Sequence, residues 1–192
     1  MSVGGWIGVG VAVLVVLLVI IFVAWYISCY NTFIRLRNNN EEAFSTMDVY
    51  MKKRYDLVPN LVSTVKGYAK HEKETLDAVI SARNMAQAAT GPEEKAKAES
   101  AFQGTIRNLM VVAENYPELK ANTNFMDLQS QLKTLESEIA SSRKYYNACV
   151  KTYNTKREVF PSNLVAKWKH FEKAPLFEIE DAQERKAVKV EF

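Results

Sequence analysis

The residues in this sequence whose types best suit catalysis or metal binding are His71 and Glu72, which stand side by side between Lys70 and Lys73. A histidine next to a glutamate could bind a metal ion or transfer protons. Metal sites in helical bundles take Glu-x-x-His pairs from two helices together with further carboxylates, and no such spacing surrounds His71. The other histidine, His170, lies far away in a basic segment. We therefore predict that His71 and Glu72 are solvated or cap a helix.

The two cysteines offer no stronger case for catalysis. Cys149 falls on an apolar helical stripe, where a free cysteine behaves as a small buried hydrophobe. Cys29 could end a lipoprotein signal, but the leucine three residues earlier and the basic start of such signals are both missing. Neither a nucleophile elbow nor a phosphate-binding glycine loop occurs. The sequence predicts no enzymatic activity, no cofactor and no metal site.

The amino-terminal segment predicts a membrane-spanning helix. No charged side chain occurs in residues 1–34, and Trp6 to Ile27 is almost unbroken in its apolar character. Its length of about 33 Å, at roughly 1.5 Å per residue, matches a hydrocarbon core of about 30 Å. Aromatic rings at the two ends are expected at the membrane interfaces. These predicted interface residues are Trp6, Trp25, Tyr26 and Tyr30.

Flanking charges predict that this helix stays attached and that the rest of the chain faces the cytoplasm. A cleavable signal peptide is disfavoured, because residues 1–5 carry no Lys or Arg and no A-x-A site follows. Basic residues occur only after the span, with Arg35 and Arg37 nearest to it. Such residues are retained on the cytoplasmic side. We expect a single-pass protein of the inner (cytoplasmic) membrane.

The remainder of the chain reads as one domain of mixed charge. It holds all 25 Lys and Arg and all 22 Asp and Glu residues of the protein. This balance gives no extended basic surface and argues against nucleic acid as a partner. The lipid membrane, further copies of the chain and another membrane protein are the partners that we expect.

Apolar spacing predicts an all-α fold, with an antiparallel long-helix bundle after the membrane helix. Apolar residues recur every three or four positions from Phe125 to Phe160, as in a long helix capped by Asn124 and ended by Pro161. One partner helix is expected from Thr32 to Ala89. The other is expected from Gly91 to Tyr116. In the first, Asn38-Asn39-Asn40 and Pro59 are the expected interruption and bend.

The carboxyl-terminal part predicts a short helix and a strand-like tail. Ser162 to Lys173 could close the bundle by packing Trp168 and Phe171 inward, or lie on a membrane surface. In the tail, Val188, Val190 and Phe192 alternate with charged residues, as in a strand. The expected domains are an anchor (1–30), a helical bundle (31–174) and an extended tail (175–192).

A series of distinctive motifs runs in order through nearly the whole chain. The motifs are Tyr30-Asn31, Leu36-Arg37-Asn38, Lys53-Arg54-Tyr55-Asp56-Leu57-Val58-Pro59-Asn60-Leu61-Val62, Val65-Lys66-Gly67-Tyr68-Ala69-Lys70-His71-Glu72, Ala113-Glu114-Asn115-Tyr116-Pro117-Glu118-Leu119-Lys120-Ala121-Asn122, Arg143-Lys144-Tyr145-Tyr146-Asn147, Tyr153-Asn154, Phe160-Pro161 and Val190-Glu191-Phe192. Together they resemble the LemA family of bacterial membrane proteins. The resemblance implies an amino-terminal anchor and a long-helix bundle, in a family without established enzymatic activity and with a magnetosome-forming member that suggests assembly at membranes.

Two functional hypotheses follow. The first is a scaffold or shell that the helical domain builds at the membrane surface by self-association. The second is an adaptor that binds a protease, a signalling protein or an envelope component. The motif around Pro59 could also be no more than a hydrogen-bonded kink in which Asp56 pairs with Lys52 or Lys53. The candidate interaction residues are Arg54, Tyr55, Asp56, Asn60, Glu114, Asn115, Tyr116, Trp168, Val190 and Phe192.

Overall fold

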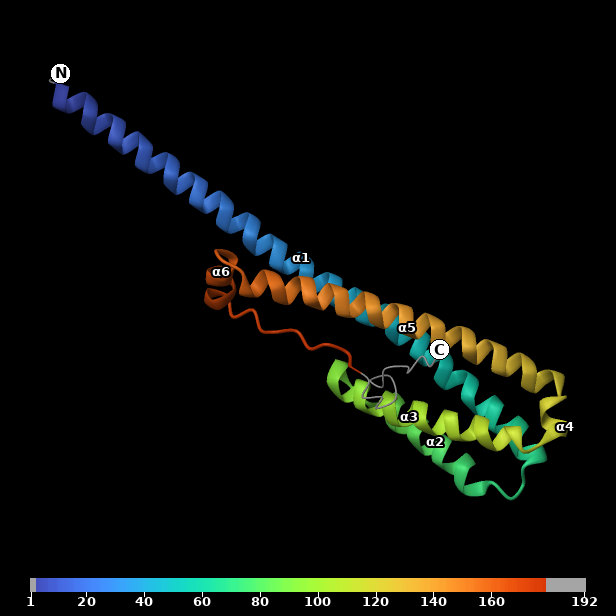
Figure 1. Ribbon diagram of the computed structural model, residues 1–192. Coiled ribbons are helices and arrows are strands. Elements are labelled where there is room, and N and C mark those ends of the chain that lie inside the picture. The colour runs from blue at the N-terminus through green and yellow to red at the C-terminus, as the bar shows by residue number, and fades with distance from the viewer. Residues whose placement is uncertain (1–2, 179–192) are drawn as a thin grey trace, which may run out of the picture. The chain divides into compact units, whose positions relative to one another are not determined.

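A computed structural model of the chain describes residues 3–178, and every regular element in that range is an α-helix. The predicted all-α class is confirmed. The predicted strand at Val188, Val190 and Phe192 lies outside the described residues. The helices, labelled in Figure 1, are α1 (Val3–Tyr68), α2 (Lys73–Ala88), α3 (Gly91–Glu114), α4 (Pro117–Lys120), α5 (Thr123–Glu158) and α6 (Ser162–Trp168).

The chain forms two compact units. The first, here called the anchor unit, comprises the chain up to Glu41 together with Cys149–Ala174. The second, here called the bundle unit, comprises Glu42–Ala148 and the segment that follows from Pro175. Helices α1 and α5 contribute to both units. The division expected from the sequence, with boundaries after residues 30 and 174, stays a prediction.

Helix α1 differs from the prediction at both ends of its soluble part. It continues through Asn38-Asn39-Asn40, where an interruption was expected, and Pro59 also lies inside it. Instead, the helix ends at Tyr68, and a turn over residues 69–72 leads into α2. The expected single helix from Thr32 to Ala89 is therefore wrong. Val65 and Leu76 are buried on either side of the turn, so the apolar pattern continues although the backbone reverses.

The core of the bundle unit follows the helical spacing seen in the sequence. Helices α2 and α3 lie side by side as a hairpin (Figure 1). Gly91 takes φ +75° at the junction, a conformation that residues with a Cβ rarely adopt. The buried residues at helical spacing include Met47, Met51, Val58 and Leu61 of α1, Leu76, Val79 and Ala82 of α2, Phe102, Ile106 and Leu109 of α3, and Phe125, Leu132 and Ile139 of α5.

Helix α5 begins and ends at other residues than the apolar stripe alone predicts. Asn122 Oδ1 accepts a hydrogen bond from the Phe125 amide at 3.0 Å, so Asn122 caps the helix and the predicted cap at Asn124 is wrong. The helix ends at Glu158, before Pro161. Phe160, expected on the buried stripe, is 79% exposed because it lies beyond the last helical turn.

We expect Leu109→Ala to destabilise the bundle unit by about 2 to 5 kcal/mol, because it leaves a cavity in a fully buried site. The matched control is Val111→Ala on the same helix, where the side chain is 58% exposed and the change is expected to cost less than about 0.5 kcal/mol. Urea unfolding of the detergent-solubilised chain, followed by circular dichroism, measures both values. Equal midpoints for the two variants would contradict the assigned core.

Candidate functional site

The centre of the bundle unit contains a buried ionic cluster. Arg54 of α1 forms a salt bridge with Glu99 of α3, and both side chains are at most 3% exposed. The Tyr55 hydroxyl donates to the second carboxylate oxygen of Glu99. Burial, together with the negative charge of Glu99, raises the pKa of Tyr55, so its hydroxyl stays protonated and remains a donor. This cluster ties α1 to α3.

Further contacts surround Arg54 and Tyr55. The Glu136 carboxylate of α5 lies 3.6 Å from the Arg54 guanidinium. The same guanidinium lies over the Phe102 ring, 5.1 Å from its centroid. Arg83 of α2 donates to the Tyr55 carbonyl oxygen at 2.7 Å. All four long helices of the bundle unit therefore contribute to one polar cluster.

This arrangement changes the interpretation of the motif at residues 53–60. Two of its predicted interaction residues, Arg54 and Tyr55, lie in the core with internal partners. The partners Glu99 and Arg54 are 45 residues apart, a pairing that helical spacing does not reveal. Asp56 and Asn60 are exposed and remain available for interaction.

A second group of motif residues joins the turns at one end of the bundle unit. The Tyr116 hydroxyl donates to the Glu72 carboxylate at 3.2 Å, and the Asn122 amide donates to the Tyr68 hydroxyl at 2.9 Å. Glu72 is thus a partner in a turn, whereas His71 is exposed. Among residues 3–178, no group of three or more His, Cys, Asp and Glu side chains is placed to hold a metal ion. Glu114 and Asn115 are exposed at the end of α3.

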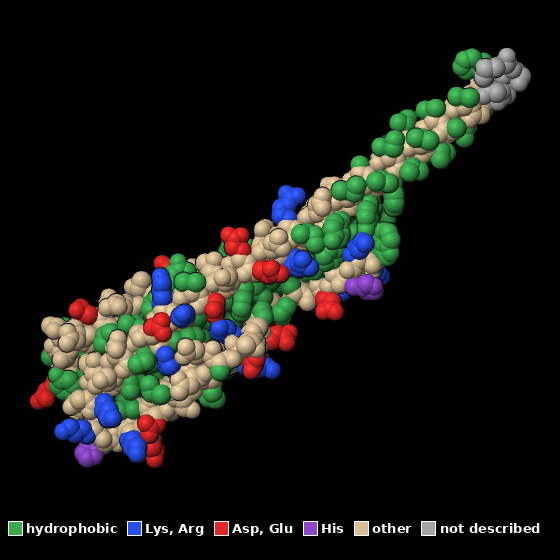
Figure 2. Space-filling view, turned by 180° about the vertical axis from the view of Figure 1, so that it is seen from behind, with side chains coloured by type: hydrophobic (Ala, Val, Ile, Leu, Met, Phe, Trp, Pro, Cys, Tyr) green, Lys and Arg blue, Asp and Glu red, His purple; other side chains and the backbone are tan. Residues whose placement is uncertain are grey.

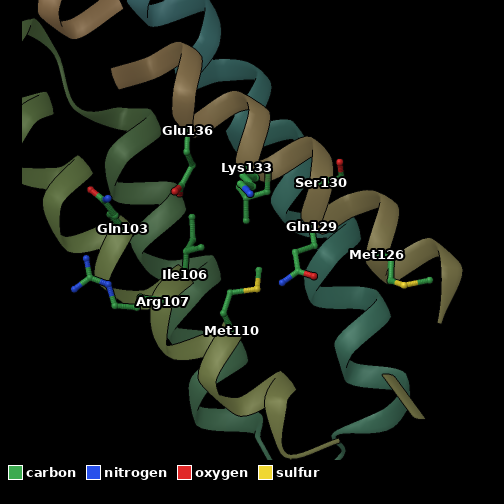
Figure 3. A pocket seen from close by; sticks show the side chains of 10 residues that line it. Gln103, Ile106, Arg107, Met110, Met126, Gln129, Ser130, Lys133 and Glu136 are labelled. Atoms are coloured by element: carbon green, nitrogen blue, oxygen red, sulfur yellow. The ribbon is translucent and has the colours of Figure 1, made fainter. Parts of the chain in front are cut away.

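A groove of about 660 Å³ lies between α3 and α5 of the bundle unit (Figure 3). Met110 from α3 and Gln129 from α5 point toward one another across it (Figure 3). Glu136 lines the groove and also contacts Arg54, so the groove borders the ionic cluster. Apolar, basic and acidic side chains share its wall. The lining residues are Gln103, Ile106, Arg107, Met110, Met126, Gln129, Ser130, Leu132, Lys133 and Glu136.

A second groove, of about 550 Å³, separates α1 from α5 in the same unit. It includes Asp56 and Asn60, the two exposed residues of the motif around Pro59. Lys53 and Leu57 complete the wall on α1. On α5 it is lined by Ser130, Gln131, Thr134 and Leu135.

A repeated Tyr-Asn pair on α5 holds extended backbone. In the bundle unit, Asn147 accepts from the Phe177 amide at 2.8 Å and donates to the Phe177 carbonyl at 3.1 Å, while the Tyr146 hydroxyl donates to the Pro175 carbonyl at 2.9 Å. Phe177 itself is 1% exposed. Burial raises the pKa of Tyr146 to about 12.

The same pattern occurs in the anchor unit, seven residues later along α5. Asn154 accepts from the Ala174 amide at 3.0 Å and donates to the Ala174 carbonyl at 2.9 Å, and the Tyr153 hydroxyl donates to the Glu172 carbonyl at 2.9 Å. Both pairs bind main-chain atoms, so they position a segment without reading its side chains. Sequence reasoning missed this role; the seven-residue spacing of the two Tyr-Asn pairs is the signal that could have revealed it.

The aromatic residues predicted at the membrane interface fall into two groups. Trp6 is 66% exposed near the start of α1. Trp25, Tyr26 and Tyr30 are partly buried against the core of the anchor unit. Trp168, a predicted interaction residue, packs on Tyr26 with ring centroids 5.2 Å apart, and Phe171 stacks on Phe33 at 4.8 Å. The expected inward packing is therefore observed for Phe171, whereas Trp168 contacts Tyr26 but is still 68% exposed.

These features define a helical protein in which one described helix, at the amino-terminal end, is long and apolar enough to cross a membrane. The model of the LemA family matches residues 43–192, and the chain belongs to this family. It is 24% identical to magnetosome protein MamQ 2 of Paramagnetospirillum magneticum over 183 residues, covering 82% of this chain and 67% of MamQ 2.

Two further relatives give the same result. Identity to protein LemA of Metamycoplasma hominis is 26% over 150 residues, covering 76% of this chain and 67% of the relative. Identity to magnetosome protein MamQ of Magnetospirillum gryphiswaldense is 24% over 182 residues, covering 81% and 67%. The predicted family is confirmed, and with it a membrane-associated helical protein.

We expect Arg54→Ala to reduce the free energy of unfolding by about 3 to 5 kcal/mol, because it leaves the Glu99 carboxylate buried without its cation. Replacing both residues by Met should restore much of that loss, since no buried charge remains. Lys52→Ala, on an exposed position of the same helix, is the control. Chemical unfolding measures all of these changes; a double variant that is no more stable than Arg54→Ala would contradict the assignment.

Tyr146 should make stability fall at alkaline pH. Its pKa is about 12 in the folded chain and about 10 when unfolded, so between these values the folded state binds more protons and unfolding becomes easier as pH rises. The stabilisation is complete below pH 10. We expect the wild type to lose about 2 to 3 kcal/mol more than Tyr146→Phe across this window. Urea unfolding of both proteins at several pH values measures it, and parallel curves would contradict the expectation.

Proposed function

We propose that this protein is a non-enzymatic scaffold at the inner membrane, built by self-association of its helical part. Helix α1 supplies the anchor, and the bundle unit supplies the contact surfaces. Arg35 and Arg37 are exposed just after the apolar stretch, which supports a cytoplasmic bundle unit because basic flanks are retained on that side. That relatives are named magnetosome proteins favours participation in an assembly.

The observation that carries the proposal is the groove between α3 and α5. In the bundle unit, the charged side chains of Arg54 and Glu99 are buried and form a salt bridge with each other, so they are not offered to a partner. The groove, in contrast, presents Met110 together with Lys133 and Glu136 at its surface. Methionine side chains adapt to the shape of a partner, and a wall that carries both signs of charge can complement another copy of itself.

The adaptor hypothesis is supported by a different observation, the groove between α1 and α5. Asp56 and Asn60 stand exposed in a motif whose Arg54 and Tyr55 are buried. The packing of the core does not require the side chains of Asp56 and Asn60. A distinct protein bound at this groove would explain why the motif continues onto the surface.

Self-association is tested by blocking the first groove. Met110→Arg combined with Gln129→Arg places two cations beside Lys133 and is expected to shift the detergent-solubilised protein toward the monomer in light scattering over a dilution series. Val111→Arg, at an exposed site on α3 that is not part of the groove lining, is the control and should leave the mass unchanged.

The outcomes separate the two functions. A wild type that is monomeric at every concentration contradicts the scaffold. A photoreactive residue at position 60 that crosslinks a distinct protein in cells, with the crosslink lost in Asp56→Lys, would then support the adaptor.

A further inference from the structure

The anchor unit carries an apolar surface formed by Phe160, Leu164 and Trp168, here called the α6 surface. These side chains are 79%, 57% and 68% exposed. Leu164 and Trp168 stand four residues apart on α6, and Phe160 lies in the turn before it. Val165 and Ala166 on the same helix are at most 3% exposed. Helix α6 is therefore apolar on two sides. Packing within the anchor unit accounts for one of them and leaves the other without an explanation.

The position of the α6 surface relative to α1 indicates what covers it. Trp168 packs directly on Tyr26, with ring centroids 5.2 Å apart. From Trp6 to Tyr26 the helix rises about 30 Å, the thickness of a hydrocarbon core. Phe22, one turn before Tyr26, is 62% exposed within the apolar stretch. The α6 surface thus lies where the membrane-spanning segment ends.

The space-filling view also shows apolar side chains continuing beyond the membrane-spanning segment. Hydrophobic side chains run along the amino-terminal helix and continue onto the body of the anchor unit beside it, and basic side chains follow (Figure 2). If the anchor unit stood in water, this apolar surface would be exposed to solvent. The headgroup layer of a bilayer, at the level where the membrane-spanning segment ends, would cover it.

The charges around the α6 surface fit anionic lipid. Lys167 and Lys169 flank Trp168, and the Lys169 ammonium lies 5.2 Å from the Trp168 ring centroid and 5.9 Å from that of Tyr30. Lysines beside interfacial aromatics can reach phosphate groups while their carbon chains stay on apolar surface. The adjacent hollow is mixed in charge, because Arg157 and Lys167 line it together with Glu158 and Glu172.

We propose that the α6 surface is a second membrane contact, which rests in the headgroup layer of the bilayer that α1 crosses. Phe160, Leu164 and Trp168 enter the interface, and Lys167 and Lys169 meet anionic headgroups. Two contacts with one bilayer restrict rotation of the anchor unit about α1. The inference rests on membrane anchoring and is independent of self-association. Three clustered side chains next to a span form a small area for a protein interface, whereas tryptophan is enriched at this depth of a bilayer.

The test uses the full chain with Trp6→Phe and Trp25→Phe, so that Trp168 is the only tryptophan. Single copies are placed in lipid nanodiscs of phosphatidylcholine and phosphatidylglycerol in equal amounts. Lipids brominated near the top of the acyl chain are expected to quench Trp168 emission, and acrylamide in the water is expected to quench it weakly. The control carries Trp168→Phe and Val111→Trp, which places the reporter on exposed α3 and should reverse both results.

Trp168 emission that acrylamide quenches and brominated lipid does not would overturn the proposal. Since each disc holds one copy, shielding by a second copy cannot account for weak quenching by acrylamide, and a monomeric wild type would contradict the scaffold without affecting this test. Lys167→Glu with Lys169→Glu should weaken lipid quenching while helical content is unchanged. Undiminished quenching in that variant would overturn the headgroup contact.

Discussion

The bundle unit depends on the requirement that a buried charge must have a partner. Arg54 and Glu99 are almost completely removed from water, and each would be strongly unfavourable alone. Their pairing is possible only when α1 and α3 adopt one register, since Tyr55 must also reach the same carboxylate. The contact with Glu136 extends this requirement to α5. Apolar packing could tolerate small shifts between these helices, whereas the ionic cluster does not.

The motifs that identify the family act largely as internal connections. The basic motif on α1 supplies the ionic cluster, and the two Tyr-Asn pairs on α5 hold the backbone that follows α6. Tyr116 and Asn122 join turns at one end of the bundle unit. These roles explain polar residues at buried positions without any catalytic chemistry. The features that the protein exposes for contacts are instead the grooves beside α5 and the α6 surface.

The function proposed for this protein therefore depends on its exposed surfaces. An apolar helix at the amino terminus confines the protein to two dimensions, where weak contacts between copies act at a high local concentration. If the proposed scaffold forms, the groove between α3 and α5 would need little intrinsic affinity to join copies under this confinement.

The sequence by itself determined the helical class, the apolar span and most of the core. Those features depend on local composition and on the spacing of residues such as Leu109, Leu132 and Ile139, which a 3.6-residue period reveals. The turn at residues 69–72 was missed because neither glycine nor proline lies within it and the apolar spacing continues across it, and the cap at Asn122 because a neighbouring asparagine suited the role equally well. The candidate site was predicted only in part. Asp56 and Asn60 are exposed as an interaction role requires, but the burial of Arg54 follows from Glu99, 45 residues away. Only the tertiary structure decided which polar residues were buried and which were presented, because that choice depends on contacts between distant segments.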